Sequence, residues 1–168
     1  ASWTGSGTFN LDNASFTQGG ANLVTNPGFE NWATPVEGST ADYWWEDSPS
    51  EFVPLTIQAD AANKTNGFFS AKITFTETGT PYFVSDTFDV AANTAFTLTM
   101  DVLDNDPAAE VNLRVRFLDA TGAGTNLTSG DYSVDNVNFQ TMTYTGTSPA
   151  NAVKAHIVVR IYDVSANW

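Results

Sequence analysis

The chain has 168 residues, no Cys, one His, and 6 Lys and Arg against 19 Asp and Glu, for a formal net charge of −13. The length suits one domain with its own core. The acidity argues against binding nucleic acid or an anionic membrane, because phosphate groups need a basic face. The lack of Cys excludes thiol catalysis, disulfide bonds and Cys-bound zinc.

Only 15% of the residues are charged, and Thr, Asn, Ser, Gly and Ala are abundant. This composition is typical of secreted bacterial β-proteins, and no apolar run approaches the length of a membrane span. The sequence begins at Ala1 without an initiator Met or a signal peptide, which we interpret as a processed chain or a fragment. We expect an extracellular or cell-surface location without membrane insertion.

Apolar and polar residues alternate with a period of two, the pattern of strands with one buried face. In chain order, the sequence predicts strands at residues 8–11, 52–58, 71–76, 82–88, 96–102, 111–117, 139–144 and 155–161. Clusters of Gly, Pro, Asn and Asp separate several of them, as at residues 26–28, 104–107 and 121–124. No window has a convincing helical period, and residues 59–64 allow at most a turn or two of helix.

Short strands at this spacing predict an all-β fold, namely a jelly-roll β-sandwich of two antiparallel sheets in a single domain over residues 1–168. Alternation along each strand sorts its residues into a buried and a polar face. The faces expected to meet in the core carry Leu98, Met100 and Val102 on one strand, and Val111, Leu113, Val115 and Phe117 on another.

Residues 22–30 read Asn-Leu-Val-Thr-Asn-Pro-Gly-Phe-Glu, and this motif resembles the first strand and turn of the jelly-roll carbohydrate-binding modules of families 4, 9, 16 and 22. Residues 66–74, 84–98 and 155–162 are similar to later strands of these modules, in order. The resemblance covers residues 22–162 and implies a non-catalytic, glycan-binding jelly roll.

These modules end with a strand of the form Tyr-Ile-Asp-Asp-Val-Ser-Leu, whereas this chain stops before any such strand. Residues 8–16, Thr-Phe-Asn-Leu-Asp-Asn-Ala-Ser-Phe, look like the missing strand. We therefore expect residues 1–20 to provide an N-terminal strand that completes the sheet of its own or a neighbouring unit, and residues 21–168 to form the body. The strand is predicted to pair alongside residues 155–162.

Three explanations fit this order: a circular permutant in which the strand folds back through the turn at residues 17–20, one unit of a tandem array, or donor-strand exchange with neighbouring copies. An unfilled slot would leave an open sheet edge, which favours refilling. The alternative is an ordinary N-terminal strand with a chance likeness, since residues 134–139 match the same short pattern.

The resemblance also implies a structural Ca²⁺ site. The matching positions here are Glu30, Asp12 and the neighbourhood of Asn66, at residues 66–70. Carboxylates, amide oxygens and carbonyl groups are the hard ligands that Ca²⁺ requires. The alternative is that Glu30 and Asp12 only cap turns at a solvated edge.

Aromatic side chains that could stack on sugar rings are densest around residues 42–46. In a strand, Trp44 and Trp45 point to opposite faces, so one belongs to the core and the other could form a platform. The candidates are Trp32, Tyr43, Trp44 and Trp45, with Tyr82, Phe83, Trp3 and Trp168 as weaker ones. Ordinary packing is the alternative for each, and the two Trp near the termini are expected to seal the open end.

Three of the six basic residues, Arg114, Arg116 and Arg160, lie on predicted strands, and Tyr162 shares a face with Arg160. Converging with Asp101, they could bind carboxylate or sulfate groups of an acidic polysaccharide. The alternative is that they pair with the abundant Asp and Glu. The overall negative charge would also slow the approach of a polyanion.

No acidic pair lies in a catalytic motif, and His156 alternates with the apolar Ile157, so the sequence favours a protein that is not an enzyme. The leading hypothesis is an extracellular polysaccharide-binding module with a structural Ca²⁺, within a larger secreted or surface protein. The alternative is a structural repeat or fibre subunit, assembled by exchange of strand 8–16 and without a glycan ligand.

Overall fold

The computed structural model describes residues 7–33, 41–46, 55–75, 80, 82–106 and 109–162. Trp3 and Trp168 lie outside the described residues. Within them the chain forms strands and no helix, so none there is long and apolar enough to cross a membrane. The strands are β1 (Gly7–Thr17), β2 (Trp44–Glu46), β3 (Leu55–Asp60), β4 (Ser70–Phe75), β5 (Tyr82–Ser85), β6 (Phe88–Asp89), β7 (Ala95–Asp104), β8 (Glu110–Leu118), β9 (Gly124–Tyr132), β10 (Gln140–Thr147) and β11 (Lys154–Tyr162).

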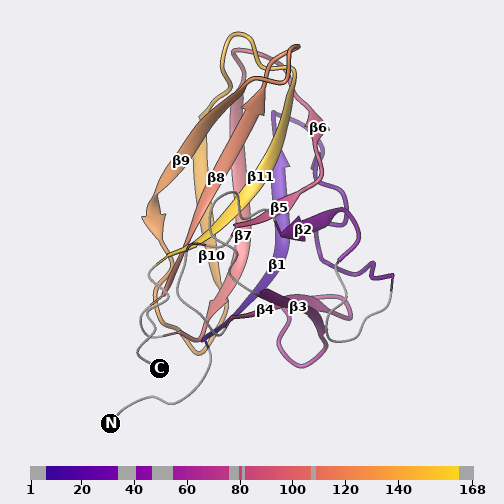
Figure 1. The fold of residues 1–168 in the computed structure, drawn as a ribbon, viewed down its shortest axis with the longest axis vertical. Coiled ribbons are helices and arrows are strands. Elements are labelled where there is room, and N and C mark those ends of the chain that lie inside the picture. The colour runs from indigo at the N-terminus through magenta and orange to yellow at the C-terminus, as the bar shows by residue number, and fades with distance from the viewer. Residues whose placement is uncertain are drawn as a thin grey trace.

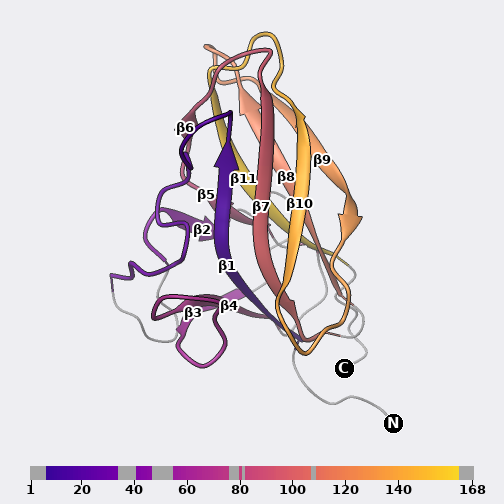
Figure 2. The same cartoon turned by 180° about the vertical axis from the view of Figure 1, so that it is seen from behind.

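The strands form two antiparallel layers, which confirms the predicted β-sandwich (Figure 1). The first sheet has the order β10-β7-β1-β4-β3, and its strands β1, β7 and β10 are nearest the viewer in Figure 2. The second sheet has the order β2-β5-β11-β8-β9, with β6 paired to β11.

The core lies between the sheets, where the apolar faces of β7 and β8 meet as predicted. Leu98, Met100 and Val102 from β7 and Val111 and Leu113 from β8 are all 0% exposed. Aromatic rings fill the rest of the interior: Phe16 lies 5.2 Å from Phe96, centroid to centroid. Because the chain has no Cys, no disulfide bond supplements this packing.

β1 is a central strand of the first sheet, paired with β4 on one side and β7 on the other. The prediction that residues 8–16 pair alongside residues 155–162 is therefore wrong. The physical reason is that β11 has no edge to offer, since β8 covers one side and β5 and β6 cover the other. The strand completes a sheet of its own chain, and permutation and exchange between copies stay predictions.

The segment after β1 folds back beside it without forming a strand. Leu23 N donates to Phe16 O at 2.9 Å, and Ala14 N donates to Pro27 O at 2.7 Å. The turn at residues 17–20 thus reverses the chain as expected. Residues 22–27 take over from β4 as the neighbour of β1 beyond Asp12, and this change of partner shapes one of the two candidate sites.

Candidate functional site

The outer face of the second sheet, opposite the core, carries two rows of paired residues. One row crosses β2, β5, β11, β8 and β9 through Trp45, Val84, Val158, Arg114 and Thr128. The next row contains Tyr82, Arg160, Asn112 and Tyr132. Directly paired residues of neighbouring strands project to the same side, so these side chains share one surface, which we call the outer face.

Two valines form the floor of this outer face. Val84 and Val158 are 1% and 4% exposed, yet they do not belong to the cluster of side chains packed between the sheets. Other side chains therefore lie over them. Side chains therefore cover part of the outer face, including apolar residues of the sheet.

Tyrosine and arginine side chains form a continuous row beside these valines, which we call the tyrosine–arginine row. The guanidinium carbon of Arg160 lies 5.4 Å from the ring centroid of Tyr82 and 4.2 Å from that of Tyr162. Tyr162 in turn contacts Tyr132, with 5.6 Å between the centroids. The row, Tyr82–Arg160–Tyr162–Tyr132, crosses from β5 through β11 to β9, and guanidinium–ring contacts of this kind hold the side chains in place.

Two further arginines adjoin the row. The guanidinium carbon of Arg114 lies 5.7 Å from the centroid of Tyr82, and its Nε donates to Thr128 Oγ1 at 3.1 Å. Arg116 lies opposite His156 in the strand register. Its side chain rests on Gly124, where a Cβ would be only 2.5 Å from Arg116 Nε.

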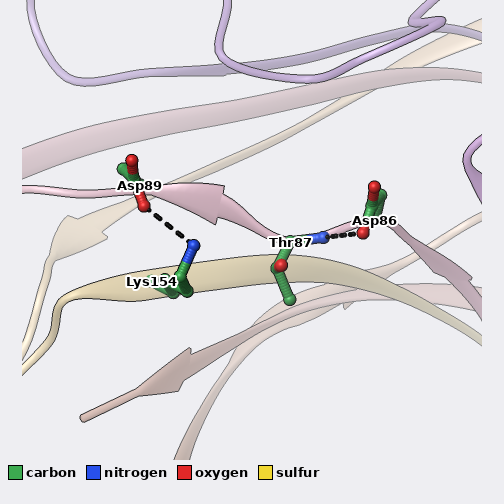
Figure 3. A network of polar contacts seen from close by, with 4 residues as sticks. All are labelled: Asp86, Thr87, Asp89 and Lys154. Atoms are coloured by element: carbon green, nitrogen blue, oxygen red, sulfur yellow. Dashed lines mark hydrogen bonds and ion pairs between the residues drawn. The ribbon is translucent and has the colours of Figure 1, made fainter. Parts of the chain in front are cut away.

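Among the described residues the one ion pair joins Lys154 Nζ to Asp89 Oδ1 at 3.0 Å, between β11 and β6 (Figure 3). None of the three arginines is ion-paired to a described carboxylate. The expected convergence with Asp101 is wrong, because Asp101 belongs to β7 in the first sheet and accepts hydrogen bonds from Asn13 and Thr141. Arg160 Nε is buried and lacks a hydrogen-bond partner in the described part of the chain.

The predicted division of the tryptophan pair is present: Trp45 is 39% exposed on the outer face, and Trp44 is 1% exposed. Trp44 stacks between Phe29 and Phe83, at centroid distances of 4.9 Å and 5.2 Å. The prediction that Trp44 could contact a ligand is therefore wrong, because core side chains pack against its ring.

The other aromatic candidates lie outside the strand rows. Trp32 packs against the core and its Nε1 donates to the carbonyl of Phe29, so it braces a turn. Tyr43 is exposed in the turn before β2, with a φ of 70°. Its carbonyl accepts a hydrogen bond from Asp86 N at 2.7 Å, which attaches the turn to the end of β5.

A second candidate site lies where the neighbour of β1 changes. Asp12 is 0% exposed, and its Oδ2 accepts hydrogen bonds from Thr65 N and Thr65 Oγ1, both at 2.8 Å. Glu30 Oε2 accepts from Phe68 N at 2.9 Å. A Cβ placed on Gly28 would lie 3.9 Å from both Asp12 Oδ1 and Glu30 Oε1, so the two carboxylates face a shared space. The structure thus brings together Asp12, Glu30 and residues 66–70, as the sequence predicted.

Unusual backbone conformations accompany both carboxylates. Asn13 and Phe29, which adjoin Asp12 and Glu30, have φ values of 49° and 54°. A bulky residue such as Phe rarely adopts this left-handed conformation, and strain of this kind concentrates at functional sites. Gly67 has a φ of 63°, and a Cβ there would be 1.9 Å from Glu30 Oε1. The backbone thus adopts left-handed conformations around the Glu30 side chain.

The donor set fits Ca²⁺ better than a transition metal. No basic side chain of the described residues is bonded to Asp12 or Glu30, although a buried carboxylate is costly without compensation. In that same part of the chain, no group of three or more His, Cys, Asp and Glu is placed to hold a metal ion. Further ligands would have to be neutral oxygens, which Ca²⁺ accepts readily. Asn66 donates to Asn13 Oδ1 at 2.7 Å, so its own Oδ1 remains for such a role.

No family model and no curated protein matches this sequence. Solved structures do match in fold. The C-terminal family 22 carbohydrate-binding module of Clostridium thermocellum Xyn10B superposes with a TM-score of 0.50 and 12% identity, over 74% of this chain and 79% of that one. The chain has the jelly-roll fold of these modules. A xylan-binding domain of family 22 gives the same TM-score and identity over 74% of this chain and 80% of its own.

Two contributors to the outer face of this jelly roll were missed from the sequence: Tyr132 and Thr128. Both lie on β9, a strand that the sequence pattern did not predict. Tyr82 was only a weaker candidate, although it contacts two arginines. The available signal was the two-residue spacing of Arg160 and Tyr162, which locates the face but not its partners on neighbouring strands.

Proposed function

We propose that this chain is a non-catalytic module that binds a polysaccharide on the outer face of its second sheet. The observation that carries the proposal is the tyrosine–arginine row, which takes its side chains from β5, β11 and β9 and lies beside two buried valines. Tyrosine rings offer flat faces on which sugar rings can stack. Trp45 extends the same surface to the β2 edge.

The chemistry of the outer face favours binding over hydrolysis. The strand pairing brings two carboxylates to it, at opposite ends of β11: Glu110 opposite Tyr162, and Asp89 in the ion pair with Lys154. Glycoside hydrolysis ordinarily requires two carboxyl groups flanking the bond. Glu110 is instead placed to accept a hydrogen bond from a sugar hydroxyl.

The fold likeness directs the choice of the first ligand. Of the two family 22 structures, one is described as a xylan-binding domain and the other through the ligand-binding role of residues in its cleft. Xylan is therefore the first polysaccharide to test. In this proposal the module works outside a cell, as part of a larger secreted or surface protein.

We further propose that Asp12 and Glu30 hold a structural Ca²⁺ with neutral oxygens of residues 65–69. The ion would supply the positive charge that two converging carboxylates lack. It would tie β1 to the turn that ends at Glu30 and to the segment that leads into β4. Its role is stability, because the outer face belongs to the other sheet.

Affinity electrophoresis in gels containing soluble xylan, with a panel of other plant and bacterial polysaccharides, tests the binding proposal. Tyr132→Ala and Trp45→Ala remove partly exposed rings from the outer face. Phe68→Ala is the matched control, because Phe68 is a 77% exposed aromatic residue outside the outer face.

We expect the wild type and Phe68→Ala to be retarded equally by at least one polysaccharide. Both outer-face variants should lose most of that retardation while keeping the unfolding midpoint of the wild type. Equal retardation of all four proteins would move the site away from the outer face. No retardation by any glycan in the panel would overturn the proposed function.

A further inference from the structure

We propose that the outer face selects a glycan carrying anionic groups, carboxylate or sulfate, and that Arg114 and Arg160 are the residues that recognise them. The inference rests on the proposed function and names the class of polysaccharide. It starts from a feature that a site for a neutral glycan does not require, an arginine pair around a single tyrosine.

Two guanidinium groups lie beside the same tyrosine ring. Both guanidinium carbons lie within 5.7 Å of the ring centroid of Tyr82, one from β8 and the other from β11. The two carbons are therefore at most about 11 Å apart, and like charges within this range repel one another. An arrangement that brings them together is relieved by a negative group bound between or above them.

The protein does not supply that negative group from its described residues. The chain has 19 acidic residues against 6 basic ones, so an arginine has many potential partners. Lys154 uses one of them, Asp89, whereas Arg114, Arg116 and Arg160 have no ion pair to a described carboxylate. Glu110 lies on the same face, opposite Tyr162, without pairing to Arg160. Half of the basic residues thus form a positive stripe on an otherwise acidic protein.

The chemistry of arginine matches the proposed ligand. A guanidinium group presents a planar fork of donors that fits two oxygens of a carboxylate or sulfate at once. Arg114 spends its Nε on Thr128 Oγ1, which leaves its terminal nitrogens for a ligand. Arg160 Nε has no hydrogen-bond partner among the described residues, so a small shift toward an anion would gain a bond without breaking one.

Tyr82 is the ring that both arginines contact, and it supplies the complementary apolar contact. A sugar ring that stacks on Tyr82 would present an acidic substituent to one or both guanidinium groups. Arg116, two residues from Arg114 on β8, would extend the contact to the next charged unit of the chain. The site therefore suits a repeating acidic polysaccharide better than one isolated anion.

Calorimetric titration with matched ligands tests the inference at a salt concentration where charges beyond about 8 Å are screened. The ligands are a linear xylo-oligosaccharide, the same oligosaccharide with one glucuronic acid branch, and a sulfated xylan. The variants are Arg114→Gln and Arg160→Gln. The control is Lys72→Gln, the same change in charge on β4 in the other sheet.

We expect at least tenfold tighter binding of a charged ligand than of the neutral one, and a preference within twofold in either arginine variant. Lys72→Gln should keep the full preference. The charged ligand that binds more tightly, the one with glucuronic acid or the one with sulfate, identifies the preferred anionic group. Equal binding of neutral and charged ligands, or retention of the preference in both arginine variants, would overturn this inference and leave the proposed function in place. Failure of all three ligands would overturn this inference, and the proposed function falls with it only if no polysaccharide of the electrophoresis panel is retarded.

Discussion

Arg160 holds its guanidinium carbon 4.2 Å from the ring centroid of Tyr162, its neighbour two positions along β11. This contact depends on the ring face and not on the phenolic hydroxyl group. We therefore expect Tyr162→Phe to bind the polysaccharide within about twofold of the wild type. Tyr162→Leu should lose about 1 kcal/mol of binding free energy, the usual scale of such a contact. Isothermal titration of both variants measures the difference, and similar losses in both would show that the hydroxyl group matters instead.

Trp44 and Trp45 provide a comparison of two substitutions with the same chemistry and opposite effects. Trp44→Ala empties the space between Phe29 and Phe83 and should reduce the free energy of unfolding by about 3–5 kcal/mol. Trp45→Ala should leave stability within about 0.5 kcal/mol and weaken glycan binding. Urea unfolding followed by tyrosine fluorescence, with affinity electrophoresis on the same samples, separates the two. A destabilised Trp45→Ala would mean that the ring is part of the packing.

Removal of Ca²⁺ should destabilise the protein if Asp12 and Glu30 hold the ion. Saturation at one hundred times the dissociation constant contributes about 2.7 kcal/mol. That corresponds to a melting temperature higher by about 5–10 °C for a domain of this size. We expect chelator to abolish this increment in the wild type and to have no effect on Asp12→Asn.

The matched control for the calcium prediction is Asp89→Asn, an equal change in charge at an exposed carboxylate. It should keep the full response to chelator. Gly67→Ala should also lose the response, because its Cβ would displace the Glu30 carboxylate. An unchanged melting temperature in the chelated wild type, with no heat of Ca²⁺ binding, would rule out the ion.

Asp104 should make stability fall as the pH rises. Burial at the end of β7 raises the pKa of Asp104 from 3.8 to about 6, and the nearby Asp135 and Asp106 add to the effect. Hydrogen bonds from Ser133 and the Asp106 amide offset part of it. The folded protein therefore holds a proton between pH 4 and 6 that the unfolded chain releases.

The stabilisation from this proton is complete below pH 4 and is lost as the pH passes 6. We expect unfolding at pH 5 to cost about 1 kcal/mol more than at pH 7.5. Asp104→Asn should remove this difference and stabilise the protein at pH 7.5. Urea unfolding at both pH values is the measurement, and a wild type that is more stable at pH 7.5 would contradict it.

Periodicity was sufficient to predict the core and part of the outer face. The two-residue alternation of β7 and β8 placed Leu98 and Leu113 correctly, since each is buried on one side of its strand only. The same rule put Arg160 and Tyr162 on one surface. The rule works because a strand with one buried and one solvent-exposed face has alternating apolar and polar residues.

The same rule fails where neither face of a strand is dry. β9 reads Gly-Thr-Asn-Leu-Thr-Ser-Gly-Asp-Tyr, and most of its residues are exposed because it is an edge strand. Because its sequence does not alternate between apolar and polar residues, β9 resembles a loop. Tyr132 was therefore not predicted to lie on the outer face. Residues 59–64, considered for a helical turn, instead finish β3 at Asp60, whose side chain then caps the following bend.

The sheet to which β1 belongs could not be predicted from its own residues. Its apolar positions, such as Leu11 and Phe16, would suit either sheet. The choice depends on which edges remain open after the other strands have paired, and that is a property of the whole chain. The position of the Asp12 carboxylate near Glu30 was nevertheless predicted correctly, because the resemblance of the motif at residues 22–30 implied that the two side chains share a site.

The central position of β1 has a consequence for how the protein folds. Its residues are synthesised before those of its partners, β4 and β7, the second of which ends at Asp104. The apolar side chains of β1 therefore stay exposed during synthesis until β7 has also been made. Contacts this distant in sequence slow folding, and the waiting strand is a natural target for chaperones during translation.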